Sequence, residues 1–358
     1  MQDYPPERGS TPRLRIKFLG KYKPGKDGTG WLKRFPGNRP AWGNCDFVFD
    51  RDCRDYDWLV VYDDLPSLAG ERHPLWVEDL ACPPENTLLL LTEPSAIKTY
   101  GRFYLRQYRW ILSTQEPWAT GRHPGRILQQ PALIWFYADS SPRGDYDTLM
   151  QYAPPAKTAE LSTVCSSKQQ GSTLHRARYN FTQALKQQLS FMEIYGHGVR
   201  PLADKADALD PYRYHLAIEN HLGPHHWTEK LADPFIGACM PIYYGCPNAE
   251  DYFPPESFLR IDINNLGAAT ELIQRAIHDK AWEKNLPAIL ESRRRVLEEY
   301  GTIATVVRLV NERHQANRAM PASPVRIQSR RRLHRQLLPG LTYALEKAYV
   351  RFRHAFLA

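Results

Sequence analysis

The amino-acid sequence predicts an α/β protein of two domains. The chain has 358 residues, which is more than one typical hydrophobic core accommodates. Hydrophobic residues make up 42% of the chain and aromatic residues 12%, so it can bury substantial cores, unlike a disordered chain. Short apolar runs alternate with connections long enough to hold helices, a pattern typical of parallel sheets.

The first half of the chain contains five short apolar runs that predict strands. Residues 58–62 (WLVVY) lie between charged flanks, and residues 86–91 (NTLLLL) end just before Glu93 and a proline. The segment 141–155 is polar and contains prolines, so it is the predicted linker and the first domain spans residues 1–154. The expected strands are residues 14–19, 58–62, 86–91, 110–113 and 132–136.

The second half shows a clearer alternation of strand and helix patterns, which predicts a second sheet with βαβ connections. This domain is expected over residues 155–320. Its predicted strands are residues 163–165, 192–195, 212–219, 241–244 and 258–261, and its predicted helices are residues 174–188, 228–238, 268–277 and 280–300.

The last segment, residues 321–358, is strongly basic. It contains eight basic residues and one acidic residue, Glu346, so it carries a net charge of +7 out of +8 for the whole chain. Leucine and aromatic residues alternate with the arginines, which predicts a basic amphipathic helix or a helix pair interrupted near Pro339 and Gly340. Such a segment either lies on an anionic membrane surface or packs on the body with a solvated arginine face.

The net charge and the cysteines limit the kinds of partner and site that we expect. A basic chain favours anionic partners, among them nucleic acids, anionic lipids and sugar nucleotides. Because residues 1–320 are close to neutral, we expect no nucleic acid partner, although a nucleic-acid-binding protein that uses its Arg-rich tail remains a rival of another class. The six cysteines are scattered and form no CxxC pair, which indicates reduced thiols rather than a disulfide framework or a zinc site.

The sequence shows no apolar signal segment at its beginning and no run of the ~18 to 20 apolar residues that a spanning helix needs. We therefore expect a cytoplasmic protein, or one bound peripherally to the inner face of the cytoplasmic membrane.

The most informative segment for chemistry is residues 210–263. An apolar strand ends in Glu219 and Asn220, and Thr228 then stands where a helix N-cap is expected, with Glu229 and Lys230 in the first turn. Ligands of open α/β sheets bind at the carboxyl ends of strands, and a helix N-terminus there offers N–H groups to a phosphate. Lys230 would add a cation, and Glu229 and Asn220 would hydrogen-bond sugar hydroxyls. The alternative is an ordinary capped helix with a surface Glu–Lys pair.

This segment resembles glycosyltransferase family 10, the α-1,3/1,4-fucosyltransferases. The matching elements follow in order: YRYHLAIEN from Tyr212 to Asn220, TEK from Thr228 to Lys230, PIYYG at 241–245 and PESFL at 255–259. Arg213, Ile218 and a His-Trp pair before Thr228 depart from the family pattern. The resemblance implies the GT-B arrangement of two Rossmann-like domains, with Tyr212 and Glu219 in the donor-binding set together with Asn220, Glu229 and Lys230.

A further donor-binding residue is implied upstream. Residues 166–179 are similar to the family segment in which an Arg-bearing helix follows a Ser-rich stretch, and Arg178 matches the arginine that touches the donor pyrophosphate. The planar guanidinium suits phosphate oxygens because it binds them bidentately. The alternative is a solvated helix arginine, and Arg176 is the next candidate.

The resemblance also indicates a catalytic base. The Thr-Glu-Pro turn that contains Glu93 looks like the family turn that holds the base. A carboxylate at the end of an apolar strand can face a cleft between domains and take the proton of an attacking hydroxyl. The alternative is a strand-end glutamate before a proline turn.

Other candidates are weaker. The two Asp-Tyr-Asp strings resemble metal-binding sequences, but such strings are common by chance, and no metal or cofactor is required by this scheme. Aromatic residues could stack on sugars, although core packing is more common for them. These candidates are Asp55–Asp57, Asp145–Asp147, His225, His226, Gly196–Gly198, Trp31, Trp42 and Tyr100.

The resemblance implies an inverting transferase that moves fucose from GDP-fucose, and we expect its acceptor to be a hydroxyl of a bacterial surface glycan such as lipopolysaccharide. Its partners would be a nucleotide sugar, an oligosaccharide or lipid-linked glycan and, through the tail, an anionic membrane. The rivals are the same fold with a different nucleotide sugar, and a catalytically inactive carbohydrate-binding relative.

Overall fold

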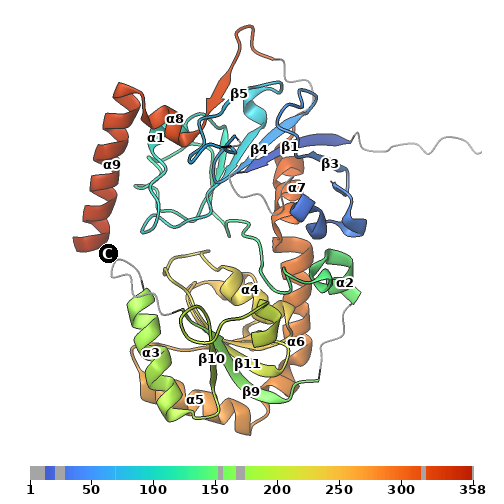
Figure 1. Cartoon of the computed structure of the whole chain (residues 1–358), viewed down its shortest axis with the longest axis vertical. Helices are drawn as coiled ribbons and strands as arrows, with labels where there is room; N and C mark the ends of the chain where they lie inside the picture. Colours follow the sequence, from blue (N-terminus) through green and yellow to red (C-terminus); the bar gives the residue numbers. More distant parts are fainter. Residues whose placement is uncertain are drawn as a thin grey trace, which may run out of the picture.

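The computed structural model describes residues 13–20, 29–68, 70–151, 156–166, 174–315 and 320–356. Two sheets of mainly parallel strands, one from each half of the chain, lie one above the other (Figure 1). A third, two-stranded sheet joins the tail to the first half. The predicted α/β fold with two Rossmann-like domains is confirmed.

The first sheet has seven strands in the order β2-β3-β1-β4-β6-β7-β8, and all neighbours are parallel except β2 and β3. Every residue of the two central strands β4 and β6 is buried, which explains their continuous apolar sequences. The strands are β1 (Leu14–Gly20), β2 (Ala41–Trp42), β3 (Cys45–Val48), β4 (Trp58–Tyr62), β6 (Thr87–Leu90), β7 (Trp110–Leu112) and β8 (Arg126–Ile127).

The predicted strand at residues 132–136 is wrong. The seventh position in the sheet is taken by β8, and residues 131–136 cross toward the second domain without a strand partner. Their apolar character has another cause, since Ile134 lies in the first core and Trp135 in the second. The amides of Phe136 and Tyr137 donate to Asp233 of the second domain at 2.9 and 3.1 Å, so they need no strand neighbour.

The second sheet has five parallel strands in the order β10-β9-β11-β12-β13. Its strands are β9 (Ala159–Val164), β10 (Glu193–Tyr195), β11 (Tyr212–Ile218), β12 (Met240–Tyr244) and β13 (Leu259–Arg260). Its helices are α3 (His175–Gln188), α4 (Glu229–Ile236), α5 (Leu266–His278) and α6 (Ala281–Arg295), which continues as a π-helical turn over Val296–Tyr300. The amphipathic patterns of the sequence predicted these helices to within a few residues.

The chain returns to the first domain after α6. Helix α7 (Thr302–Arg313) lies beside the first sheet (Figure 1). Its side chains Ile303, Val306 and Val310 are buried in the core of that sheet. The sequence prediction places residues 302–320 in the second domain, whereas these side chains pack in the first. The boundary predicted at residues 154 and 155 lies outside the described residues. The segment predicted as a linker contains helix α2 (Tyr146–Gln151), whose Leu149 belongs to the second core.

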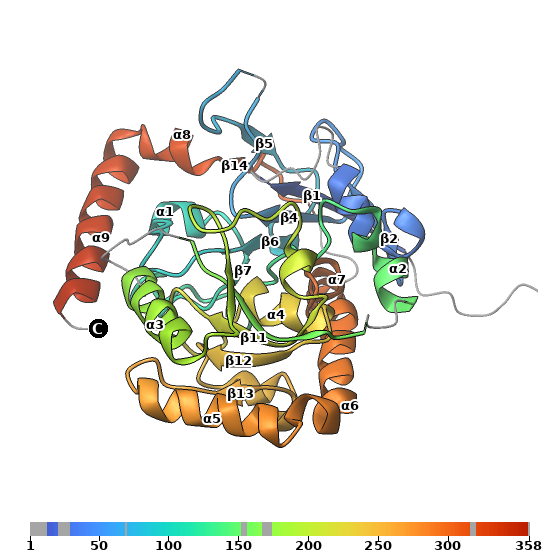
Figure 2. The ribbon, with the colours of Figure 1, turned by 60° about the horizontal axis from the view of Figure 1, so that its bottom comes forward.

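The tail also packs on the first domain. Strand β14 (Arg326–Gln328) pairs antiparallel with β5 (Val77–Asp79), and helices α8 (Arg330–His334) and α9 (Leu337–Phe356) follow. The predicted helix pair is present, but its break lies at residues 335–336. Pro339 falls in the first turn of α9, where proline is tolerated. Figures 1 and 2 show α9 standing along one side of the molecule. Within the described ranges, no helix combines the length and apolar character that a membrane crossing requires.

Candidate active site

A pocket of about 530 Å³ lies between the two domains. It is formed where the strands of both sheets end: Asp63 follows β4, Glu93 follows β6 and Asn220 follows β11. Since the carboxyl ends of parallel strands carry the ligand sites of open sheets, the pocket lies where the sequence pattern predicts it. Residues from the crossing segment and from the first turn of α4 complete its wall, namely Leu133, Ile134, Phe136, Glu229 and Lys230.

A second pocket of about 270 Å³ opens beside it within the second domain. It is lined by the end of β9, by Arg178 of α3 and by Lys205. Asn220, Glu229 and Lys230 line both pockets and therefore form the shared wall. Four of the predicted donor-binding residues are thus brought together: Arg178, Asn220, Glu229 and Lys230.

Arg178 is directed into the smaller pocket by the packing of its helix. Phe181, Thr182 and Leu185 of α3 face the core, and Arg178 lies on the same face at one helical turn's distance. The residue is only 7% exposed. Its buried Nε has no hydrogen-bond partner among the described residues, and neither has the buried Oδ1 of Asn220. Buried polar atoms without partners are costly, so two of them at one pocket indicate a polar ligand.

Thr228 begins helix α4 as its N-cap, as predicted. Its hydroxyl accepts from the Lys230 amide at 3.3 Å, which satisfies a free amide of the first turn. Glu219 holds Thr228 in place, because its carboxylate accepts from the Thr228 amide at 2.8 Å and from the hydroxyl at 2.7 Å. Glu219 is fully buried and burial raises its pKa. Both of its oxygens are therefore engaged in positioning the start of α4.

The Glu229–Lys230 pair lies at the shared wall. Lys230 Nζ is 2.8 Å from Glu229 and 3.7 Å from Glu219. Burial would raise the pKa of Glu229, but the charges of Lys230 and Lys205 outweigh it and hold the pKa at about 2. Burial likewise opposes the charge of Lys230, yet Glu229 and Glu219 raise its pKa. The wall thus keeps a permanent cation beside a permanent anion.

Tyr212 does not join the other predicted donor residues. It begins β11, and its hydroxyl lies 2.7 Å from that of Tyr195. A strand of seven residues separates it by about 20 Å from the carboxyl end of β11. The structure therefore places Tyr212 at the opposite edge of the sheet, away from both pockets.

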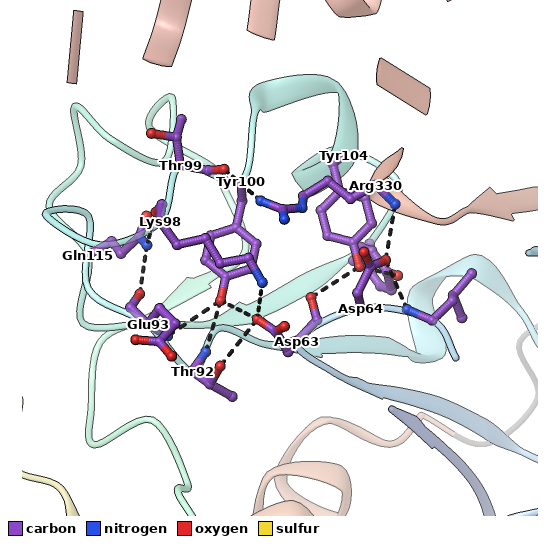
Figure 3. A network of polar contacts seen from close by, with 12 residues as sticks. Asp63, Asp64, Thr92, Glu93, Lys98, Thr99, Tyr100, Tyr104, Gln115 and Arg330 are labelled. Carbon is purple, nitrogen blue, oxygen red and sulfur yellow. Dashed lines mark hydrogen bonds and ion pairs between the residues drawn. The ribbon is translucent and has the colours of Figure 1, made fainter. Parts of the chain in front are cut away.

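Glu93 faces the larger pocket with a free carboxylate. Among the described residues, its carboxylate oxygens have no hydrogen-bond partner, whereas its carbonyl accepts from Gln115 at 2.7 Å and its amide donates to Tyr100 at 3.4 Å (Figure 3). Burial raises the pKa of Glu93, and the neighbouring Asp63 carboxylate raises it further. A half-buried carboxylate with a raised pKa is a better proton acceptor than one in water.

The sequence analysis missed the network that fixes Glu93. Asp63 accepts from Lys98, from the Tyr100 hydroxyl at 2.6 Å and from Thr92 at 3.2 Å (Figure 3). The Tyr100 hydroxyl in turn accepts from the amides of Thr92 and Glu93, so that Asp63 positions the turn through a tyrosine. One signal was present in the sequence, since Asp63 directly follows the predicted strand 58–62.

The histidines before Thr228 take different places. His226 lines the larger pocket and lies 3.0 Å from the Thr114 hydroxyl of the first domain. Burial and then His221 lower its pKa to about 3, so it is neutral. His225 instead contacts Tyr252 at 2.7 Å, outside the residues that line the two pockets.

The weaker candidates have structural contacts. Asp57 accepts from the Arg15 amide, and Asp145 accepts from Thr148 within the first turn of α2. Trp31 packs against Phe18 in the first core. The part of the chain that the structure describes contains no group of three or more His, Cys, Asp or Glu residues that could hold a metal ion.

Comparisons with known proteins agree with the geometry of the second domain. Residues 154–279 match the family model of glycosyltransferase family 10 (fucosyltransferase), C-terminal part. The matched segment includes Arg178 and the strand–loop–helix unit that carries Glu219 to Lys230.

Several curated proteins are similar to part of this chain. A gorilla 4-galactosyl-N-acetylglucosaminide 3-alpha-L-fucosyltransferase FUT6 is 27% identical over 171 residues, which cover 43% of this chain and 46% of the relative. The Helicobacter pylori alpha-(1,3)-fucosyltransferase FucT is 33% identical over 72 residues, 20% of this chain and 15% of the relative. The chain therefore spans less than half the length of these relatives. A crystal structure of an alpha1,3-fucosyltransferase with GDP-fucose is 16% identical, with a TM-score of 0.45, over 84% of this chain and 96% of that chain.

Proposed function

We propose that this chain, whose residues 154–279 match the model of the C-terminal part of glycosyltransferase family 10, transfers fucose from GDP-fucose to a hydroxyl group of a glycan, with inversion at the anomeric carbon. The observation that carries the proposal is the shared wall. Asn220, Glu229 and Lys230 line both the pocket that contains the unpartnered Nε of Arg178 and the pocket that contains Glu93, whose carboxylate has no hydrogen-bond partner among the described residues. A donor bound across this wall would bring its leaving group and its sugar into different pockets.

The smaller pocket suits the diphosphate of the donor. Arg178 and Lys230 supply two cations, and the positive end of the α4 helix dipole lies at the same place. As the bond between fucose and GDP breaks, negative charge grows on the leaving phosphate oxygen. Fixed cations stabilise that charge most when they are held in position before the reaction, as the packing of α3 and the Glu219–Thr228 contact hold these.

The larger pocket suits the acceptor. An acceptor hydroxyl near Glu93 would attack the anomeric carbon from the face opposite the diphosphate, forming the new C–O bond while the bond to GDP breaks. Glu93 would take the hydroxyl proton, and GDP would leave with the bonding electrons. Glu229 and Asn220, at the wall between the pockets, are placed to hydrogen-bond the hydroxyls of the sugar in transit.

Donor choice is tested by binding. GDP-fucose, GDP-mannose and UDP-galactose are titrated against the chain, and the melting temperature and dissociation constant are measured. We expect GDP-fucose to bind most tightly and the purified product of transfer to carry an inverted anomeric bond in its NMR spectrum. Binding of another nucleotide sugar in preference to GDP-fucose would refute the proposed donor and favour the rival in which the same fold uses a different one.

We also propose that the acceptor is a surface glycan such as lipopolysaccharide, met at the inner face of a bacterial cytoplasmic membrane through α9. The apolar side chains of this helix recur every three or four residues and so form one face. They are open to solvent, with Leu345 74% and Phe356 72% exposed. The tail's net charge of +7 complements anionic lipid. The exposed apolar residues of α9 are Leu337, Leu338, Leu341, Leu345, Tyr349, Phe352 and Phe356.

The membrane proposal is tested by vesicle flotation. Replacing Leu341 and Leu345 by Gln should greatly reduce the fraction of protein that floats with phosphatidylglycerol vesicles while donor binding is unchanged, because neither residue lines the two pockets. If the apolar face instead joins two copies of the chain, the wild type will be a dimer without lipid and the variant a monomer, and the membrane proposal fails.

A further inference from the structure

A third cavity, of about 860 Å³, lies between the loop at residues 95–99 and helix α9. We call it the tail groove. Its lining is rich in cations and, among the described residues, contains no Asp or Glu. The Lys, Arg and His residues that line it are Lys98, Arg330, Lys347, Arg351 and His354.

The shape of the tail groove is fixed, because α9 contacts the first domain at several points. Gly101 has φ +92°, and a Cβ there would lie 3.1 Å from the Tyr343 ring, so α9 approaches at a point that favours glycine. Glu346 accepts from the Arg102 amide at 2.9 Å. Near the other end of α9, His354 Nε2 lies 2.8 Å from the Ser95 hydroxyl.

The tail groove adjoins the acceptor side of the active site. Ile97 lines both the tail groove and the larger pocket. Lys98 lines the tail groove and pairs with Asp63, which lines the larger pocket. The tail groove shares no lining residue with the smaller pocket that suits the diphosphate. A ligand in it would therefore extend from an acceptor near Glu93 rather than from the donor.

The cations of the tail groove are only partly compensated. Lys98 pairs with Asp63, and Arg330 donates to the Thr99 carbonyl at 3.0 Å. Lys347 and Arg351 have no carboxylate partner among the described residues, and Lys347 Nζ lies 6.0 Å from the centre of the Tyr343 ring. Like charges gathered without an anion raise the local positive potential, which favours an anionic ligand.

The cations of the tail groove lie on a different face of α9 from its exposed apolar side chains. Tyr343, Lys347, Val350 and His354 recur at helical spacing and face the tail groove, whereas the exposed stripe that contains Leu341 and Leu345 lies on the opposite side of α9. Lys347 and Arg351 therefore point toward the acceptor side, away from the surface expected to meet lipid.

We infer that the tail groove binds a phosphate group carried by the acceptor glycan, and that the transferase acts on phosphorylated acceptors. Lys347 and Arg351 would make the contacts, because the guanidinium binds phosphate oxygens bidentately and the ammonium adds a point charge. The inference rests on the proposed transferase function, since it assigns the tail groove to the acceptor of that reaction.

The test uses inorganic pyrophosphate as the probe and the whole chain saturated with GDP, which fills the donor pocket. We expect pyrophosphate to bind the GDP-loaded wild type, and its dissociation constant to rise at least tenfold in the Lys347→Gln, Arg351→Gln double variant. The matched control is Arg331→Gln with Arg335→Gln, which removes two exposed cations of the tail that do not line the tail groove. An equal loss in both variants, or no binding to the GDP-loaded wild type, overturns the inference.

Two further measurements are needed. The first distinguishes a phosphate on a glycan from the phosphate of a lipid headgroup, and the second distinguishes this inference from the proposed transfer reaction. Binding to phosphatidylglycerol vesicles should fall to a similar degree in both double variants; a loss confined to the tail-groove variant would assign these cations to lipid headgroups and overturn the inference. GDP affinity should be the same in all three proteins. If pyrophosphate binding behaves as expected but GDP-fucose does not bind, the proposed transfer fails and the anion site stands. If GDP-fucose is transferred but the tail-groove variant keeps its pyrophosphate affinity, only this inference fails.

Discussion

The two pockets at the shared wall differ in how far apart their residues lie in the sequence. The smaller pocket draws all its residues from positions 163–230, within the second domain. The larger pocket combines residues between positions 62 and 230 from both domains, and its network extends to Arg330 in the tail. The proposed donor pocket is formed mainly by one strand–loop–helix unit and a neighbouring helix, while the proposed acceptor pocket forms only once residues from both domains and the tail have assembled.

The largest effect should follow from removing the unpartnered carboxylate of the larger pocket. Glu93→Gln should lower kcat by about 10²- to 10⁴-fold, because the amide cannot take the hydroxyl proton. The dissociation constant for GDP-fucose should stay within a factor of two or so, since Glu93 does not line the smaller pocket. Steady-state kinetics and calorimetry measure the two quantities. Glu256→Gln, an exposed residue of the second domain, is the control, and equal activity of both variants would refute the base assignment.

The next effect should be confined to the donor side. Arg178→Gln should raise the dissociation constant for GDP by about 10- to 100-fold, the equivalent of about 1.5 to 3 kcal/mol for a hydrogen bond to a charged group. Arg176→Gln is the matched control, because Arg176 lies exposed on the same helix. If calorimetry finds the loss in the Arg176 variant instead, the phosphate contact belongs to the other arginine.

The pH dependence of kcat/KM should distinguish Glu93 from Glu229. Transfer requires deprotonated Glu93, so kcat/KM should fall as the pH drops through its pKa, which burial and Asp63 hold above the ordinary value of 4.5. Glu229, with a pKa of about 2, stays ionised over this range. Asp63→Asn removes a nearby negative charge and should move the acid limb of the profile to lower pH. A limb that stays in place in this variant would show that another group titrates.

The smallest effect should be on stability at the donor side. Thr228→Val removes the N-cap of α4 and leaves Glu219 without its hydroxyl donor, which should lower the free energy of unfolding by about 1 to 2 kcal/mol in urea titrations. Thr270→Val is the comparison, because its hydroxyl donates to a carbonyl within α5 and should cost less. Equal losses would mean that the Glu219–Thr228 contact adds nothing to the start of α4.

The same contrast explains what the sequence could predict. Glu219, Asn220, Glu229 and Lys230 lie within twelve residues, so the strand ending and the N-cap signal were sufficient to group them. Glu93 was predictable as a strand-end carboxylate. Tyr212 was grouped with them by its place in the motif, but a strand has two ends and the tyrosine lies at the other one.

The features that the sequence analysis missed depend on contacts between residues that are far apart in the chain. The link from Asp63 through Tyr100 to Glu93 depends on the packing of two loops. The apolar segment 132–136 reads as a strand because Ala132 and Ile134 pack in the first core and Trp135 in the second, a fact visible only when both domains are in place. Similarly, the amphipathic pattern of residues 326–356 predicts helices but not that β14 pairs with β5 and fixes them beside the active site.

The central claim is that one donor molecule spans the wall between the two pockets. A crystal structure of the chain with GDP-fucose tests it most directly. The account predicts the diphosphate against Arg178 and the start of α4, with the fucose ring passing Glu229 and its anomeric carbon open to the pocket that contains Glu93. A diphosphate bound elsewhere, or a fucose directed away from Glu93, would contradict it.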